Sequence, residues 1–318
     1  MGSIPMGHSP KGDAGMNQNS ERKGIFYAGS AYFAWGVLPI YWNLINGISA
    51  EKILAHRIIW AFVFMMLILL VTRKMPLFFS ALKQLRQEPK KLLVLIIVSL
   101  LISANWGSYI WAVNNERILE ASLGYYINPL VSVMLGVFIL KERLTKAQLM
   151  SVVLAFIGVL IMTINLGEVP YIALLLGFSF AFYGLMKKQI VFDAAVGLTV
   201  ETMIMIPIAL IYLLVIKEVA LASHAIDNLL LLGTGAVTAL PLLYFAKGAR
   251  FLSLTTLGFL QYIAPTITLL IGVFVYKEAF LLTHFIAFSF IWLALIVFSV
   301  SKTKWFVKKV VNEKQLSA

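Results

Sequence analysis

Long apolar runs, separated by short polar breaks, follow one another along almost the whole chain. A hydrocarbon layer about 30 Å thick needs roughly 20 apolar residues per helix, because every backbone polar group must be satisfied within the segment. Ten runs meet this need, at residues 24–45, 53–72, 92–113, 119–140, 147–166, 169–186, 197–216, 228–246, 252–276 and 282–301. The pattern predicts an all-α integral membrane protein of ten transmembrane helices, with any binding within or between the helices.

The composition supports this fold class. Of the 318 residues, 61% are hydrophobic and 13% are charged, and the mean hydropathy is +0.91. A water-soluble core cannot use that much apolar surface. Cysteine is absent, and neither a phosphate-binding loop nor an HExxH segment occurs, so we expect no cofactor and no metal.

The net charge of +12 raises the question of a nucleic-acid partner, but the basic residues follow the positive-inside rule. With ten spans and a cytoplasmic N-terminus, almost all of them fall on the cytoplasmic side. The other side holds only Lys52, Arg117, Lys217 and Lys277. We therefore predict that both termini are cytoplasmic and that the protein binds no nucleic acid.

The two ends of the chain are polar. Residues 1–23 lack the apolar core of a signal peptide, and we expect residues 1–15 to be a leader ahead of a natural start at Met16. Residues 302–318 are expected to form a basic cytoplasmic tail. The membrane part divides into residues 24–166 and 167–301, with five predicted helices in each.

An internal repeat relates these two halves. The segment 126–129 (YINP), followed by 136–138 (GVF) and 141–142 (KE), returns 136 residues later as YIAP at 262–265, with GVF and KE at the same spacing. An odd number of helices per unit makes the second unit enter the membrane from the opposite side. Inverted repeats are typical of secondary transporters that work by alternating access, although some channels also use them.

Several segments resemble the RarD group of the EamA family, in the drug/metabolite transporter superfamily. They are 31–36 (AYFAWG), 53–57 (ILAHR), 110–115 (IWAVNN), 119–130 (LEASLGYYINPL) and 257–263 (LGFLQYI). The resemblance covers about residues 23–302. It implies an exporter of metabolites or drugs in the bacterial inner membrane, with ten helices in two inverted repeats. Its usual label, chloramphenicol sensitivity, is a phenotype and names no substrate.

The candidate site begins with the ionisable residues inside the predicted spans: His56, Arg57, Glu120 and Glu201. A charge at a helix centre costs roughly 2.5–3.5 kcal/mol, so such residues usually face a bundle interior or a water-filled path. Two alternatives remain open at this stage. Arg57 can instead reach the membrane surface, and each glutamate can simply favour a helix N-terminus. We expect a proton, if one is coupled, to use His56, Glu120 or Glu201.

Two polar helix faces in corresponding positions of the repeat point to a midplane site. Glu120 and Asn128 share one face of the fourth predicted helix, with Pro129 expected to break it, and Gln261 with Pro265 marks the ninth. Aromatic and amide side chains extend the expected substrate-binding set. These are Tyr32, Trp35, Asn105, Trp106, Asn115, Tyr126, Tyr183 and Tyr262.

A membrane enzyme is the weaker alternative. The segment 177–181 (GFSFA) superficially matches the nucleophile segment of intramembrane serine proteases, but a serine nucleophile needs a histidine within hydrogen-bond reach. We therefore predict a transporter, not an enzyme, that binds a small-molecule substrate and contacts membrane lipid. An uncoupled facilitator or flippase is the nearest rival, and the sequence leaves the substrate, the transport direction and the oligomeric state open.

Overall fold

The computed structural model describes residues 18–45, 48–115, 117–167, 169–190, 192–216, 225–277 and 281–301. The predicted leader at 1–15 and tail at 302–318 lie outside the described residues. The secondary structure of the described chain is helical. The helices are α1 (Gln18–Leu44), α2 (Ala50–Val71), α3 (Met75–Gln87), α4 (Pro89–Asn114), α5 (Ile118–Phe138), α6 (Lys146–Leu166), α7 (Tyr171–Lys187), α8 (Ala194–Val215), α9 (Ala225–Phe251), α10 (Leu254–Gln261), α11 (Ile263–Phe274) and α12 (Leu282–Ser301).

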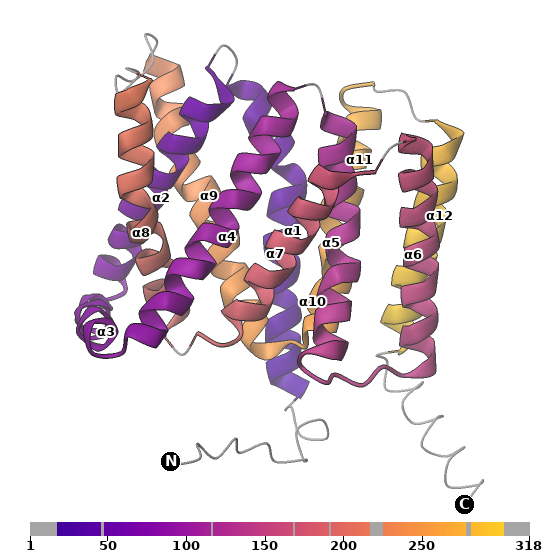
Figure 1. The fold of residues 1–318 in the computed structure, drawn as a ribbon, viewed down its shortest axis with the longest axis horizontal. Helices are drawn as coiled ribbons and strands as arrows, with labels where there is room; N and C mark the ends of the chain where they lie inside the picture. The colour runs from indigo at the N-terminus through magenta and orange to yellow at the C-terminus, as the bar shows by residue number, and fades with distance from the viewer. Residues whose placement is uncertain are drawn as a thin grey trace, which may run out of the picture.

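All but α3 stand side by side in one bundle (Figure 1). Gln18 and Ser301, the ends of the described chain, lie at the same side of the bundle, which we call the terminal face. The side across the bundle is the opposite face. α6 and α12 pack on each other at one flank, and α2 packs on α8 and α9 at the other, with α1, α5 and α7 between them.

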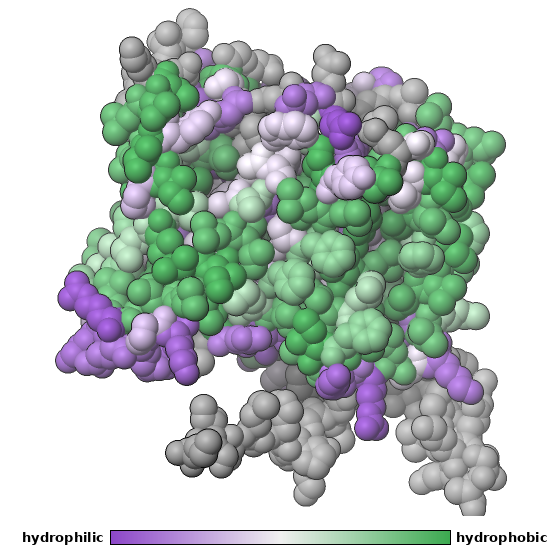
Figure 2. Space-filling model, in the orientation of Figure 1, coloured by the Kyte–Doolittle hydropathy of each residue, from purple (hydrophilic) through white to green (hydrophobic). Residues whose placement is uncertain are grey.

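The surface of the bundle suits a membrane. Eight stretches of the described chain are long and apolar enough to cross one, counting α10 and α11 as a single stretch. Figure 2 shows apolar side chains over the middle of the visible face, with hydrophilic side chains gathered at its terminal edge. This is therefore a multi-pass membrane protein, as the apolar pattern predicts.

Two of the ten predicted spans, α1 and α7, are not among those eight stretches. α7 is only 17 residues long, and α1 carries many tyrosine, tryptophan, glycine and polar residues, which lower its mean hydropathy. Both helices nevertheless run through the middle of the bundle (Figure 1). Other helices surround them, so less of their surface needs to be apolar.

The first difference from prediction is α3, since the sequence was expected to form only a joining loop between the second and third spans. Met75–Gln87 is an amphipathic helix that lies across the terminal face. Its buried residues Phe78, Ala81 and Leu85 follow one another at three- and four-residue spacing. The spacing was readable in the sequence, but the segment is too short and too basic to count as a span.

The second difference concerns the prolines. α5 runs without interruption through Pro129, so the predicted break there is wrong. The interruption lies in the other half, at Tyr262 between α10 and α11. Pro265 thus falls in the first turn of α11, where a missing N–H donor costs little. α5 is packed between α7 and α10, and this packing holds it helical despite the donor lost at Pro129.

The helices pack in matching pairs. α1 lies against α9 and α11, and correspondingly α7 lies against α4 and α5. α2 packs on α8, α5 on α10, and α6 on α12. Lys141 and Lys277, which are 136 residues apart, both have a left-handed backbone with φ of 58°. The repeat in the sequence thus has a counterpart in both packing and backbone geometry.

Candidate substrate site

A cavity of about 250 Å³ lies in the middle of the bundle. Helices from both halves of the chain supply its walls. The lining residues are Tyr32, Trp35, Leu38, Pro39 and Trp42 of α1, Arg57 of α2, Asn105, Trp106 and Tyr109 of α4, Ser122, Gly124, Tyr125, Tyr126 and Asn128 of α5, Leu176 and Phe180 of α7, Thr238 and Leu242 of α9, Gln261 of α10, and Ala264, Pro265 and Thr268 of α11.

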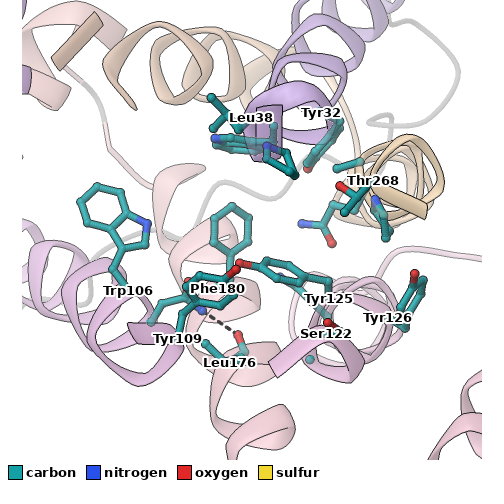
Figure 3. A pocket seen from close by; sticks show the side chains of 18 of the residues that line it. Tyr32, Leu38, Trp106, Tyr109, Ser122, Tyr125, Tyr126, Leu176, Phe180 and Thr268 are labelled. Carbon is teal, nitrogen blue, oxygen red and sulfur yellow. Dashed lines mark hydrogen bonds between the residues drawn. The ribbon is translucent and has the colours of Figure 1, made fainter. Parts of the chain in front are cut away.

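The cavity occupies the half of the bundle nearer the opposite face. α1 rises from the terminal face, and only its residues from Tyr32 onward line the cavity. α5 descends from the opposite face, and its contribution ends at Asn128, about midway along the helix. Figure 3 shows the aromatic rings of Tyr109 and Tyr125 meeting inside the cavity, with ring centroids 5.9 Å apart.

Arg57 is the one charged residue among the described lining residues. Its Nε–H donates to the hydroxyl of Thr238 at 3.1 Å. The guanidinium carbon lies 5.0 Å from the ring centroid of Trp42 and 4.5 Å from that of Trp106. Arg57 therefore turns into the cavity and is held by a hydroxyl and two cation–π contacts, which excludes the alternative in which it reaches for the membrane surface.

Three amide side chains also line the cavity. The Nδ2 of Asn105 donates to the carbonyl of Leu176 and to the hydroxyl of Ser179, both at 2.9 Å. The hydroxyl of Ser132 donates to Oδ1 of Asn128 at 3.2 Å and reaches Oε1 of Gln261 at 3.5 Å. The two repeat-related helices α5 and α10 thus meet through polar side chains at the level where the sequence predicts a midplane site.

Packed aromatic rings close the cavity toward the terminal face. Phe245 of α9 is fully enclosed and contacts the rings of Tyr32, Trp35, Phe180 and Tyr183 at centroid distances between 5.5 and 6.1 Å. Tyr183 lies within this layer instead of lining the cavity. The rings leave little room for a solute to pass in this state.

Charged contacts seal the terminal face below these rings. The Glu142 carboxylate, which follows α5, accepts from the backbone amides of Leu254 at 2.6 Å and Thr255 at 2.9 Å, at the N-terminus of α10. The ammonium of Lys188 donates to the carbonyls of Ala249 and Leu252. Burial lowers the pKa of Lys188, and the nearby Glu142 carboxylate opposes that shift. The Glu142 bonds connect the two halves of the chain, whereas the Lys188 bonds lie within the second half.

The two predicted glutamates have partners within the protein. Glu201 is buried, with its Oε1 2.5 Å from the ammonium of Lys187, and it also accepts from the hydroxyl of Tyr183 at 3.4 Å. Glu120 accepts from the amide of Ile172 at 2.7 Å and pairs with Arg117 at 3.0 Å. Glu120 thus stabilises the N-terminus of α7, a different helix from the one the sequence suggests.

Three more predicted residues lie away from the cavity lining. His56 is buried on α2, Asn115 is exposed and donates to the carbonyl of Trp111 in its own helical turn, and Tyr262 donates from its hydroxyl to the carbonyl of Tyr126. Eight predicted residues do line it. They are Tyr32, Trp35, Arg57, Asn105, Trp106, Tyr126, Asn128 and Gln261.

Residues 22–164 match the EamA-like transporter family. The uncharacterized transporter YojE of Bacillus subtilis (strain 168) is 49% identical over 292 residues, which cover 91% of this chain and 98% of that relative. Protein RarD of Escherichia coli (strain K12) is 45% identical over 89% of this chain and 96% of its own length. The chain belongs to the RarD group of the EamA-like transporter family.

Two further comparisons are more distant. A protein of Pseudomonas aeruginosa named chloramphenicol-sensitive protein RarD is 27% identical over 86% of this chain and 93% of its own length. A solved crystal structure of another protein has a TM-score of 0.68 and 16% identity, covering 86% of this chain and 96% of that one. At that identity the likeness shows a shared fold alone.

Three further observations concern residues in and beside the cavity. The sequence places Lys187 in a loop, yet it is the last residue of α7 and is buried against Glu201. Tyr125 and Thr238 also line the cavity without having been predicted, because nothing in an apolar run marks which face turns inward. Ser179, of the protease-like segment, is bound by Asn105 and donates to the carbonyl of Leu176.

Proposed function

We propose that this RarD-group transporter is a secondary carrier that exports a small metabolite or drug-like molecule by alternating access. Residues 24–166 and 167–301 would act as two inverted five-helix repeats with the substrate between them. The observation that carries the proposal is the central cavity, walled by both halves and closed toward the terminal face by Phe245 and its neighbours. A binding site between inverted repeats is the usual plan of such carriers.

The helix pairing supports the inverted repeat. The main contacts between the halves have counterparts, since α1 packs on α9 and α11 while α7 packs on α4 and α5. Counting α10 and α11 as one span and omitting the surface helix α3 gives ten spans. The two halves can then rock against each other about contacts of equivalent geometry.

We further propose that the protein resides in the bacterial inner membrane with the terminal face in the cytoplasm. Basic side chains gather at that face, among them Lys74, Arg86 and Lys91 on or beside α3. The positive-inside rule places such clusters in the cytoplasm. In this orientation the described state has its cavity toward the outside.

Uncoupled facilitation is the second candidate, and a specific observation favours it. No carboxylate or histidine belongs to the described lining of the cavity, and Glu120 and Glu201 are engaged by protein partners. A proton-coupled carrier needs a titrating group whose partners change during transport. Among the predicted coupling residues, His56 remains the simplest candidate because its Nε2 is buried without a hydrogen bond in the described structure.

The test is transport by the purified full-length protein in liposomes, with a panel of amphenicols and aromatic acids, amides and amines. Carrier activity predicts saturable flux and accelerated exchange when substrate is present on both sides. Dependence on an imposed proton gradient that disappears in His56→Gln would support coupling through that residue. Absence of saturable flux for every probe, in protein that remains folded, would contradict the proposed function.

A further inference from the structure

The cavity contains a cation that the protein does not neutralise. Arg57 has five N–H donors, and within the described residues only its Nε–H has a hydrogen-bond partner, the hydroxyl of Thr238. No acidic side chain is among the described residues that line the cavity. A guanidinium withdrawn into an apolar bundle without an acid is costly, so an anion supplied from outside would be stabilised there.

The position of the guanidinium is fixed before any ligand arrives. Trp42 from α1 and Trp106 from α4 contact it through their rings, and Thr238 from α9 holds the Nε edge. The terminal nitrogens remain available to a planar acceptor. Arginine binds carboxylates through two parallel N–H bonds, a geometry that a guanidinium held on three sides offers without further ordering.

The other lining residues indicate the size and polarity of the rest of the ligand. Trp35, Phe180 and Leu242 are apolar, whereas Asn105, Asn128 and Gln261 add amide groups. The volume of about 250 Å³ is below the usual range for drug-sized ligands, which is about 300–1,000 Å³. With one cation in the described lining, a single negative charge is matched and a phosphate dianion is not.

We infer that the cavity selects a small organic monocarboxylate with an aromatic or other planar apolar body, its carboxylate on Arg57 and its body between the aromatic walls. This inference rests on the proposed function, because it names the substrate class of the same site. It differs from a general drug exporter in requiring a negative charge. A neutral amphenicol can accept hydrogen bonds from Arg57 but gains no attraction between opposite charges.

The test compares ligands that differ only in charge. Binding of 3-phenylpropionate and of its primary amide to the purified protein in detergent is measured by calorimetry, within a panel of aromatic acid and amide pairs. For at least one pair, the acid should bind ten times more tightly than the amide or better. Equal binding within every pair, or no binding of any acid, would overturn the inference.

Variants assign the preference to Arg57. Arg57→Gln should bring acid and amide to equal affinity, and Arg57→Lys, which keeps the charge but loses the planar fork, should retain only part of the preference. Lys83→Gln, which removes an exposed charge on α3, is the matched control and should leave the preference unchanged. Retention of the full preference in folded Arg57→Gln would overturn the assignment.

Transport separates this inference from the proposed function. If liposomes carry chloramphenicol, and Arg57→Gln carries it equally well while no acid is preferred, the carrier function stands and the carboxylate inference fails. If acids bind through Arg57 but no probe crosses the membrane, the binding inference stands and the carrier function fails.

Discussion

Charged groups near the terminal face have partners within the protein that the charge lining the cavity lacks. Near the terminal face, Lys187 pairs with Glu201, and Glu142 binds two backbone amides of α10. In the cavity half, Arg57 has aromatic neighbours and one hydroxyl but no acid among the described residues. The partnered charges belong to the layer that we propose stays closed, whereas the charge without an acid marks the place where we propose that a substrate binds.

The largest loss of stability is expected when the deeply buried ion pair between Lys187 and Glu201 is broken. Glu201→Gln leaves the Lys187 ammonium buried without its counter-charge, and removing one partner of such a pair typically costs 3–5 kcal/mol. Thermal unfolding in detergent should show this as a large loss of stability. The double variant Lys187→Met with Glu201→Leu should recover most of the loss, because an apolar pair of similar volume needs no counter-charge. Normal stability of Glu201→Gln would contradict the pairing.

A smaller effect is expected at Glu142, and it tests whether its contacts keep the terminal face closed. Glu142→Gln keeps the shape of the side chain but weakens its two bonds to the N-terminus of α10, at a cost of about 2 kcal/mol. If that contact closes the terminal face, the fraction of molecules that are open at the terminal face should rise up to about 30-fold. Thiol labelling of Thr255→Cys from the terminal side should accelerate correspondingly. Lys141→Gln, beside it, is the control, and an unchanged rate in Glu142→Gln would exclude the contact as a closing device.

The support of Arg57 predicts weaker binding of an anionic ligand together with a small loss of stability. Thr238→Val preserves volume and removes the acceptor of the Arg57 Nε–H, so the guanidinium loses one of its three fixed contacts. A single hydrogen bond of this kind is worth about 1 kcal/mol, or roughly fivefold in affinity for an anionic ligand. Calorimetry checks the affinity, and thermal unfolding should show only a small loss of stability, about 1 kcal/mol. Fivefold weaker binding of a neutral amide as well would show a general distortion of the cavity.

The smallest effect belongs to the half-exposed pair between Lys74 and Asp193 at the terminal face, 2.8 Å apart. Partial burial raises the pKa of Asp193, but the bonds from Lys74 and from the Ala195 amide outweigh it and hold that pKa below its ordinary value. Asp193→Asn keeps a good helix N-cap and loses only the ion pair, so stability should fall by about 0.5 kcal/mol at pH 7.

The pH dependence of that loss has a defined sign. A depressed folded pKa contributes stability that is complete above the unfolded value of about 4 and is lost as the pH falls through the folded value. Parent protein and Asp193→Asn should therefore differ in unfolding free energy at pH 7 and converge as the pH falls below the folded pKa. A difference that grows on acidification would contradict the depressed pKa.

How much the sequence could predict depends on how local the cause is. The apolar runs act within one segment, and the structure contains them as helices. The capping box that Thr145 and Gln148 form at the start of α6, with both of its bonds, has an equally local cause. The repeat is readable because a 136-residue offset preserves residue types. The amphipathic helix α3 was missed because the search was for long apolar runs.

The candidate site could be predicted only in part, because the contacts that shape it are not local in the sequence. Arg57 and Asn128 line the cavity, as expected for polar residues inside spans, but their role in binding stays a prediction. Glu120 and Glu201 do not line it, because the amide of Ile172 and the ammonium of Lys187 engage them from other helices. Residues that are distant in the chain decide which buried charge has a partner within the protein. A single sequence does not reveal which residues these are.

The most direct test of the account is the sidedness of the cavity. Because the chain contains no cysteine, a single Ser122→Cys in the cavity wall reports alone, with Ser80→Cys on α3 as the control for the terminal face. In intact cells, a membrane-impermeant maleimide should label Ser122→Cys, more slowly when a bound ligand is present, and should label Ser80→Cys only after permeabilisation. Labelling of Ser122→Cys from the cytoplasmic side alone, or no protection by any bound ligand, would contradict a substrate cavity open across from the termini.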